Sequence, residues 1–164
     1  MKLKNIQFNI EEYDSVNALP QADLRLMEYA EKAISKAYTP YSHYRVGAAI
    51  RLSNGEIFTG NNQENAAYPS GLCAERVALF YAKSQQPDET IEAIAITARS
   101  DDFIIREAVS PCGGCRQVMA EYQIQQSSPI RVIMKGEKGP VLAINSIEEL
   151  LPLMFHAEEL KRKT

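Results

Sequence analysis

All three cysteines of this 164-residue chain lie in two short motifs, Cys73-Ala74-Glu75-Arg76 and Pro111-Cys112-Gly113-Gly114-Cys115. Thiolates that include a Cys-x-x-Cys pair select zinc among the abundant metals. Three protein ligands leave the fourth tetrahedral position open for water, which is the arrangement of a catalytic site. We therefore expect Cys73, Cys112 and Cys115 to bind a catalytic zinc ion.

Both motifs fall at the start of a predicted helix, and this placement favours metal binding. The N-terminus of a helix carries partial positive charge and free N–H donors, which lower the pKa of a nearby thiol. Pro111 suits the first turn of a helix, where its missing N–H is not needed. Cys112 and Cys115 lie one turn apart, so Cys73 must reach the same ion from another helix.

The two residues after Ala74 complete the predicted site. Three thiolates on one divalent ion leave a net charge of about −1, which weakens the metal as a Lewis acid. Each helix terminus changes the pKa of bound water by only about 0.2 to 0.7 unit, whereas catalysis needs a fall from about 15.7 to about 7. We expect Arg76 to donate hydrogen bonds to the thiolates and Glu75 to accept the proton of the water.

Two other interpretations of the cysteines remain open. A Cys-x-x-Cys motif also occurs in redox dithiols, but that role would leave Cys73 and Glu75 unexplained. A structural zinc site would need a fourth ligand, and the two histidines of the chain, His43 and His156, are the imidazoles available for it. We expect His43 to lie in a surface loop, and we assign it no catalytic role.

Hydrophobic periodicity predicts an α/β protein with a three-layer α/β/α fold, in which helices cover both faces of a five-stranded mixed sheet. An extra strand is expected over residues 4–11, in an N-terminal extension (residues 1–19) of a single domain (residues 1–164). The predicted strands of the main sheet are 46–52, 57–59, 92–97, 130–134 and 141–144, with hairpin turns at 54–55 and 136–139. The predicted helices cover 20–38, a segment from residue 73, 112–122 and 146–151.

Composition and charge exclude several classes of partner. A formal net charge of −3 and a pI near 5.5 argue against nucleic-acid binding, which relies on clustered Lys and Arg. The one basic cluster, Lys161-Arg162-Lys163, is expected to be a solvated helix end. The longest apolar runs are far shorter than the roughly 20 residues of a membrane span. An odd number of cysteines and an N-terminus without signal-peptide features favour the cytoplasm.

With these residues the chain resembles a family, the small zinc-dependent cytidine deaminases that act on free nucleosides. The resemblance covers the chain from about Tyr38 to the last predicted helix, and it rests on several motifs in the same order. Besides the cysteine motifs, these are Thr39-Pro40-Tyr41-Ser42, the loop from Gly60 to Tyr68, and Leu150-Leu151-Pro152 leading to Phe155. The resemblance implies a cytidine-deaminase-like fold.

The resemblance also implies a reaction. Cytidine and 2′-deoxycytidine would be deaminated to uridine and 2′-deoxyuridine with release of ammonia, a step of pyrimidine salvage. Hydroxide formed at the zinc, with one ion in each subunit, would attack C4 of the cytosine while Glu75 relays protons to N3 and to the leaving amine. Members of this family form homotetramers with shared active sites, so Phe155 would reach the site of a neighbouring subunit.

Four further residues receive substrate-binding roles from the resemblance alone. Asn62 and Glu64 would hydrogen-bond the ribose hydroxyl, Tyr44 would stack on the base, and peptide groups near Ala74 would hold the polar edge of the pyrimidine. Taken without the resemblance, Asn62 and Glu64 would be interpreted as a solvated turn, and Tyr44 as an aromatic residue of the core or of an interface.

The chain departs from the family pattern at Tyr44-Arg45, where the family usually has Phe-Pro. A tyrosine keeps the stacking face but adds a hydroxyl, and Arg45 loosens the turn and adds charge. The N-terminal strand also lies beyond the family pattern, where it would extend a sheet edge or a subunit contact.

Three alternative functions follow from the same residues. A deaminase of a modified cytosine nucleoside, such as a blasticidin-type antibiotic, is the alternative enzyme, although Phe155 and the Asn62/Glu64 pair favour an ordinary nucleoside. A polynucleotide-editing deaminase is disfavoured, because those enzymes commonly use His as the first ligand and need a basic face. A zinc-binding interaction module without turnover is the non-enzymatic alternative, which an intact Glu75 disfavours.

Overall fold

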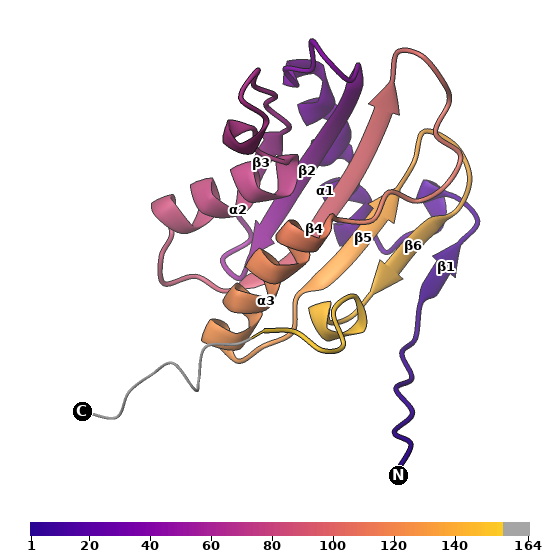
Figure 1. Cartoon of the computed structure of the whole chain (residues 1–164), viewed down its shortest axis with the longest axis vertical. Helices are drawn as coiled ribbons and strands as arrows, with labels where there is room; N and C mark the ends of the chain where they lie inside the picture. The colour runs from indigo at the N-terminus through magenta and orange to yellow at the C-terminus, as the bar shows by residue number, and fades with distance from the viewer. Residues whose placement is uncertain (156–164) are drawn as a thin grey trace.

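The computed structural model describes residues 1–155, which form one mixed sheet of six strands in the order β1-β6-β5-β4-β2-β3 (Figure 1). The strands are β1 (Glu11–Tyr13), β2 (Tyr44–Leu52), β3 (Ile57–Asn61), β4 (Ile91–Ser100), β5 (Arg131–Lys135) and β6 (Val141–Ile144). The α-helices are α1 (Gln21–Ala33), α2 (Ala74–Gln85) and α3 (Gly113–Gln126). Short 3-10 helices are η1 (Val16–Ala18), η2 (Ile34–Lys36), η3 (Tyr68–Ser70) and η4 (Ile147–Glu149).

The sheet contains the two predicted hairpins and one parallel pair, and two further antiparallel pairs, β2 with β4 and β1 with β6, complete it. β2 and β3 are antiparallel around Gly55, and β5 and β6 are antiparallel around a turn that contains Gly139. These two glycines have φ angles of +83° and +88°, a left-handed conformation that glycine adopts without strain. β4 and β5 are parallel and are connected through α3.

Helices cover both faces of the sheet, which confirms the three-layer fold. On one face α1 packs Leu26, Met27 and Ala30 against small strand residues. On the other face α2 and α3 pack Leu79 and Met119 against the larger residues of β2, β4 and β5. Figure 1 views the sheet from the side of α2 and α3, with α1 behind it. β4 is buried on both faces, in agreement with its Ile-rich sequence.

The N-terminal strand is shorter and later than predicted. We expected it over residues 4–11, but it covers Glu11–Tyr13, and residues 1–10 run away from the sheet without strand structure (Figure 1). The alternation of apolar residues in this segment is a strand pattern, but a strand also needs a partner, and β6 pairs only with residues 11–13. The predicted position is therefore wrong, whereas the prediction that a strand extends the sheet edge is confirmed.

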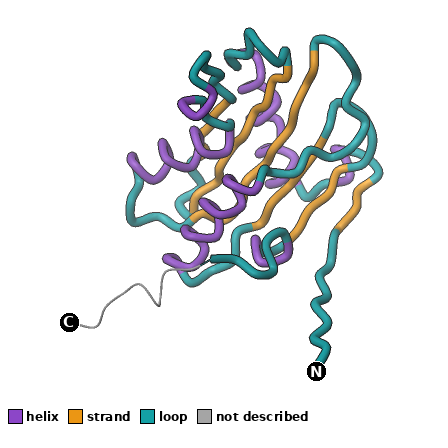
Figure 2. The backbone as a smooth tube through the Cα atoms, viewed as in Figure 1, coloured by secondary structure: helices purple, strands orange, loops and turns teal. Residues whose placement is uncertain are grey.

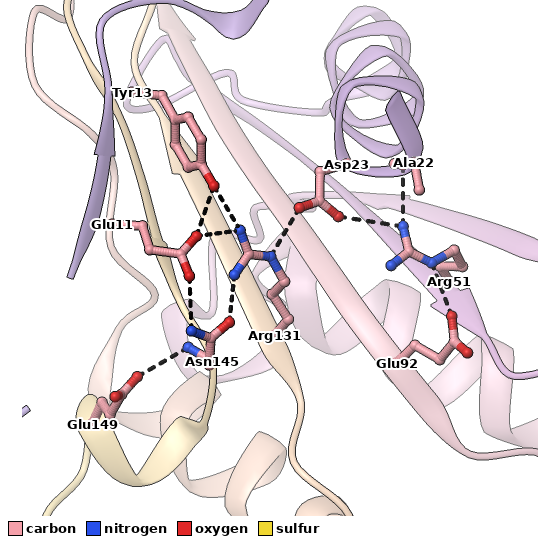
Figure 3. Close-up of polar contacts among 9 residues, drawn as sticks. All are labelled: Glu11, Tyr13, Ala22, Asp23, Arg51, Glu92, Arg131, Asn145 and Glu149. Atoms are coloured by element: carbon pink, nitrogen blue, oxygen red, sulfur yellow. Dashed lines mark hydrogen bonds and ion pairs between the residues drawn. The ribbon is translucent and has the colours of Figure 1, made fainter. Parts of the chain in front are cut away.

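A polar network fastens β1 and α1 to the sheet (Figure 3). Arg131 of β5 donates to Glu11 at 2.6 Å, to Asp23 of α1 at 2.8 Å and to Asn145. Asp23 is buried, and its other carboxylate oxygen lies 3.5 Å from Arg51 of β2. A buried carboxylate needs charged or hydrogen-bonding partners, so Asp23 holds both arginines at the interface between α1 and the sheet.

The ends of three predicted helices are also revised. The helix predicted over 112–122 is α3, which extends four residues further, to Gln126. The helix predicted over 20–38 is α1 followed by η2, and the helix predicted over 146–151 is only the 3-10 helix η4. A capping box between Ser146 and Glu149 is nevertheless present, as the spacing of Ser and Glu in the sequence indicates. The predicted basic helix end at 161–163 lies outside the described residues. Within residues 1–155, no helix is both long enough and apolar enough to cross a membrane.

Candidate active site

The three cysteines come together where α2 and α3 begin. These two helices lie over the same face of the sheet (Figure 1). Cys73 is the N-cap residue of α2, Cys112 is the N-cap residue of α3, and Cys115 lies in the first turn of α3. Pro111 precedes the N-cap and so lies outside the helix, not in its first turn as predicted. Two helix N-termini with partial positive charge therefore lie beside the same three thiols.

A glycine in β3 allows α2 to approach closely enough to bring Cys73 to the site. A Cβ atom at Gly60 would lie 2.5 Å from Ala74 O and 2.5 Å from Ala78 N, both backbone atoms of α2. Backbone atoms cannot rotate away as the end of a side chain can, so a larger residue would displace the first turn of α2. The position of Cys73 therefore depends on Gly60.

The spacing of the sulfurs fits a tetrahedral zinc ion. The Sγ atoms of Cys73 and Cys112 are 3.8 Å apart, those of Cys112 and Cys115 are 3.5 Å apart, and all three lie within 4.8 Å of one another. Zinc–thiolate bonds of about 2.3 Å in tetrahedral geometry place sulfurs about 3.8 Å apart. The donor set is also the one that zinc prefers, since all three atoms are thiol sulfurs.

The residues around the sulfurs distinguish a three-ligand metal site from the two alternatives, a structural zinc site with a fourth ligand and a redox dithiol. Among residues 1–155, no His, Asp or Glu side chain joins the sulfur group as a fourth ligand. His43 instead lies with Nδ1 3.4 Å from Asp102, and His156 lies outside the described residues. A redox dithiol needs only two thiols, whereas the structure adds Cys73 as a third. The arrangement therefore favours a three-ligand metal site.

The thiol cluster accumulates negative charge that a cation would neutralise. The neighbouring Cys115 thiol, with further contributions from Arg76 and Cys112, lowers the pKa of Cys73 to about 5. Arg76 contributes by donating from Nη2 to the Cys73 sulfur, 3.8 Å away, as predicted. Interaction with Cys73, together with burial, raises the pKa of Cys115, because a second negative charge is unfavourable there. A divalent cation would remove this penalty, since it deprotonates the thiols that coordinate it.

Glu75 lies in the first turn of α2, two residues after Cys73, and only 4% of it is exposed. Burial raises the pKa of Glu75, and the nearby charge of Cys73 raises it further. A carboxyl group with a raised pKa accepts and returns a proton more readily near neutral pH. This environment suits the predicted proton shuttle.

A pocket of about 490 Å³ is lined in part by Cys73 of the thiol cluster. Cys73 and Arg76 line it from α2, Asn62 and Glu64 line it from the loop after β3, and Ser42 lines it from the turn before β2. Sites for small molecules commonly have volumes of about 300–1,000 Å³. The structure thus brings a predicted zinc ligand and the predicted ribose-binding residues to one cavity.

Glu64 is held in this pocket by two residues that the sequence analysis did not single out individually. Its carboxylate accepts hydrogen bonds from Tyr41 N at 2.9 Å, from Ser42 N at 3.3 Å and from the Ser42 hydroxyl. Burial opposes ionisation, but these hydrogen bonds prevail and lower the pKa of Glu64. The sequence signal was the turn after Pro40, because successive backbone N–H groups in a turn bind anions.

The side-chain amide of Asn62 forms two hydrogen bonds with the backbone of β2. Its Oδ1 accepts from Val46 N at 2.8 Å, and its Nδ2 donates to Tyr44 O at 2.8 Å. The next residue, Gln63, exchanges two backbone hydrogen bonds of 2.9 Å with Leu72. The loop after β3 is therefore an ordered wall of the pocket and not a solvated turn.

Six other predicted site residues do not belong to the lining that the described residues give this pocket. Glu75, Cys112 and Cys115 lie at the starts of α2 and α3 as described above, and the other three are predicted substrate-binding residues. Tyr44 is half-buried at the start of β2, and its ring faces Phe103 with 6.3 Å between the ring centroids. Ala74 is fully buried at the first position of α2. Phe155 is 65% exposed, and its carbonyl oxygen accepts from Gln117 of α3 at 2.8 Å.

Comparison with known proteins assigns this fold and site to a class. Residues 20–128 match the family described as the cytidine and deoxycytidylate deaminase zinc-binding region. The matched range contains both cysteine motifs and the loop after β3 that carries Asn62 and Glu64, which we call the pocket loop.

Three individual proteins that resemble this chain are named as deaminases. A cytidine deaminase of Halalkalibacterium halodurans is 39% identical over 135 residues, which are 82% of this chain and 95% of that protein. A blasticidin-S deaminase of Bacillus cereus is 32% identical over 139 residues, which are 84% of this chain and 94% of that protein. The crystal structure of cytidine deaminase from Burkholderia pseudomallei superposes with a TM-score of 0.69 at 38% identity, covering 80% of this chain and 97% of that one. The chain belongs to the cytidine deaminase family, whose members are hydrolases, so the resemblance seen in the sequence is confirmed.

Proposed function

We propose that this protein deaminates cytidine and 2′-deoxycytidine by zinc-dependent hydrolysis, yielding uridine, 2′-deoxyuridine and ammonia for pyrimidine salvage in the cytoplasm. The observation that carries the proposal is the buried Glu75 beside three thiols that fit zinc, next to a pocket of about 490 Å³. The cytidine deaminases among its relatives support this choice of substrate.

Cys73, Cys112 and Cys115 would hold one zinc ion in each subunit. When bound, zinc supplies Lewis acidity that lowers the pKa of water from about 15.7 to about 7, so that hydroxide is available near neutral pH. Arg76, which donates to the Cys73 sulfur, would offset part of the negative charge of the three thiolates.

Glu75 would move the protons of the reaction. Its carboxylate takes one proton from the attacking water and delivers it to N3 of the pyrimidine as the bond from oxygen to C4 forms. It then carries the remaining hydroxyl proton to the amine, so that the C4–N bond breaks and ammonia leaves. One water is consumed for each ammonia released, and Glu75 returns to its starting protonation state.

The pocket loop would bind the sugar, and Tyr44 would stack on the base. Glu64 accepts three hydrogen bonds from its neighbours, and an ionised carboxylate offers about four lone-pair sites, so it can also accept from a ribose hydroxyl. Asn62 keeps a second N–H of its amide for the same purpose. Peptide groups near Ala74, at the start of α2, would hold the polar edge of the pyrimidine.

Phe155 would complete the active site of a neighbouring subunit in a homotetramer. Its ring is 65% exposed, while its backbone is tied to α3 through Gln117. An aromatic side chain that is exposed on an anchored backbone is suited to an interface. Sedimentation that gives a monomer at the concentrations of the activity assay would contradict this part of the proposal.

A modified cytosine nucleoside of the blasticidin type is the second candidate substrate. The 32% identity with a protein named blasticidin-S deaminase favours it. Comparing kcat/KM for cytidine, 2′-deoxycytidine and blasticidin S distinguishes the candidates, and the preferred substrate is the one with the highest ratio.

The decisive experiment mixes the zinc-loaded protein with cytidine, follows the loss of ultraviolet absorbance and identifies uridine by chromatography. Glu75→Gln is the matched variant, because it keeps the shape of the side chain and removes its proton transfer. We expect unchanged zinc content and a turnover reduced by at least about 10²-fold. Undiminished turnover in this variant would contradict the role of Glu75, and a zinc-loaded wild-type protein inactive on all three nucleosides would be a silent zinc-binding module.

A further inference from the structure

Three consecutive residues at the start of β2 contact three consecutive residues that follow β4. The two segments are residues 43–45 and residues 101–103. His43 Nδ1 lies 3.4 Å from Asp102, the rings of Tyr44 and Phe103 have centroids 6.3 Å apart, and Arg45 forms an ion pair with Asp101. The backbone adds a hydrogen bond of 3.1 Å from Asp101 N to His43 O. This backbone bond lies one residue beyond the last pair of the β2–β4 ladder, Tyr44 with Ser100, and the other three contacts are made by side chains.

The ion pair fixes the direction of the Arg45 side chain. Both Nη2 and Nε of Arg45 donate to the same Asp101 oxygen, at 2.8 Å and 3.2 Å. In the strand register Arg45 lies directly opposite Arg99 of β4, and like charges directly opposite one another are unfavourable. Asp101 supplies the opposite charge that turns Arg45 toward the 101–103 segment.

The 101–103 segment is itself held by the turn between β5 and β6. The Glu137 carboxylate accepts from Ser100 N at 3.3 Å and from Ile105 N at 3.2 Å. In return, the backbone N–H groups of Glu137 and Lys138 donate to Ile105 O at 2.9 Å and 3.1 Å. The segment begins the long loop from β4 to α3 (Figure 2), yet these bonds hold it on both sides of Phe103.

On its other side, the backbone of Tyr44 is bound to residues that line the pocket. Tyr44 N donates to Ser42 Oγ at 3.1 Å, and Tyr44 O accepts from Asn62 Nδ2 at 2.8 Å. Ser42 and Asn62 both line the pocket that contains Cys73. Tyr44 thus lies between the pocket, which holds its backbone, and the 101–103 segment, which contacts its ring.

We propose that the 101–103 segment positions Tyr44 for the substrate, through Phe103 against its ring and through Asp101 on the neighbouring Arg45. The inference rests on the proposed role of Tyr44 as the residue that stacks on the base. The Arg45 and Asp101 side chains are 37% and 41% exposed, and an ion pair of this exposure adds little to global stability. Its loss therefore acts on the binding of the base and not on the fold.

A double-mutant cycle on Arg45→Ala and Asp101→Ala tests this positioning role. We expect each single variant to raise KM for cytidine about three- to tenfold with kcat nearly unchanged, because binding and not chemistry is affected. The double variant should be no worse than either single one, since the two residues act as a pair. Arg99→Ala is the matched control, because it removes the arginine across the ladder and leaves the ion pair intact.

A fluorescent variant gives a readout that does not require turnover. The chain contains no tryptophan, so Phe103→Trp introduces a single indole against the ring of Tyr44, and its emission can be excited at wavelengths that the eight tyrosines do not absorb. We expect cytidine to change the emission of the zinc-loaded Glu75→Gln/Phe103→Trp protein. Adding Arg45→Ala should shift the midpoint of this titration to a concentration about three- to tenfold higher, in agreement with the KM values.

The outcomes separate this inference from the proposed function. Turnover of cytidine with unchanged KM and an unshifted titration in the Arg45 and Asp101 variants overturns the positioning role and leaves the proposed function standing. A fall in kcat together with a lower melting temperature, at constant KM, indicates a purely structural segment and also overturns it. A wild-type protein that neither binds nor converts a cytosine nucleoside overturns both.

Discussion

The guanidinium of Arg76 lies one helical turn from the thiol of Cys73, with Nη2 3.8 Å from the sulfur and with Nε buried without a hydrogen-bond partner among residues 1–155. A buried donor without a partner costs about 1–3 kcal/mol. This cost is offset where the positive charge of the guanidinium stabilises nearby negative charge. Arg76 faces the only thiol cluster of the chain, whose three sulfurs would carry more negative charge than one divalent ion neutralises.

We predict that Arg76→Gln, which keeps a hydrogen-bond donor but removes the charge, lowers zinc affinity or turnover by about 10- to 100-fold. Zinc affinity is measured by competition with a chromophoric chelator, and turnover is measured on the fully loaded protein. Arg25→Gln, an exposed arginine of α1 on the opposite face of the sheet, is the control and should change neither quantity. Equal zinc affinity and equal turnover in the two variants would contradict the charge-balancing role.

The close approach of α2 to Gly60 leads to a second prediction. Gly60→Ala introduces a Cβ atom 2.5 Å from two backbone atoms of α2, so the first turn of the helix must move. We expect the free energy of unfolding to fall by about 1–3 kcal/mol. The zinc content should fall with it, because the Cys73 sulfur moves away from the sulfurs of Cys112 and Cys115. Urea unfolding and zinc analysis of the purified variant measure the two effects.

Gly113→Ala is the matched control for this glycine. A Cβ atom at Gly113 meets no atom within 4 Å, although the residue lies between two of the predicted zinc ligands. Replacement of glycine at a compatible position stabilises a protein by about 0.4–1 kcal/mol through the unfolded state. If Gly113→Ala is as stable as the wild type or more stable, and has normal zinc content, then the loss in Gly60→Ala comes from the contact with α2. A similar loss in both variants would count against that explanation.

Features that depend on neighbouring residues were predictable from the sequence. The cysteine motifs predicted the cluster of three thiols, because a Cys-x-x-Cys pair at a helix start places two sulfurs one turn apart. Gly55 marked a hairpin for a local reason, namely the left-handed conformation of the turn. The capping box at Ser146 was visible from a spacing of three residues.

Features that depend on distant partners were not predictable in this way. Residues 4–11 have the alternation of a strand, but Arg131, 120 positions after Glu11, fixes where pairing with β6 begins. The hydrogen bonds of Glu64 to Ser42 and the contact of Tyr44 with Phe103 likewise join segments far apart in the sequence. Periodicity reports which face of a segment is apolar, and it carries no information about which partner is available.

Ser42 provides a third prediction, because its hydroxyl joins two of the proposed substrate-binding residues. It donates to the Glu64 carboxylate and accepts from Tyr44 N at 3.1 Å. A hydrogen bond of this kind contributes about 1 kcal/mol, so we expect Ser42→Ala to raise KM for cytidine about fivefold at nearly constant kcat. Ser70→Ala, an exposed serine of the 3-10 helix η3, is the control. An unchanged KM in Ser42→Ala, or an equal rise in the control, would count against the role of the hydroxyl.

Glu11 provides a fourth prediction, on the dependence of stability on pH. A hydrogen bond from Arg131, with smaller contributions from Tyr13 and Asn145, lowers the pKa of Glu11 from 4.5 to about 2. Because the folded-state pKa is the lower one, the ionised carboxylate stabilises the fold above about pH 4.5. This contribution is lost as the pH falls toward 2.

The variant Glu11→Gln isolates this contribution. At pH 7 we expect it to lower the free energy of unfolding by about 1 kcal/mol, less than the full pKa shift, because 38% of the Glu11 side chain is exposed and solvent screens the ion pair. The difference between wild type and variant should shrink as urea unfolding is repeated at pH 4, 3 and 2.5. Glu12→Gln, on the opposite face of the same short strand, should show no such dependence. A difference that stays constant down to pH 2.5 would mean that the bond to Arg131 does not hold β1 on the sheet.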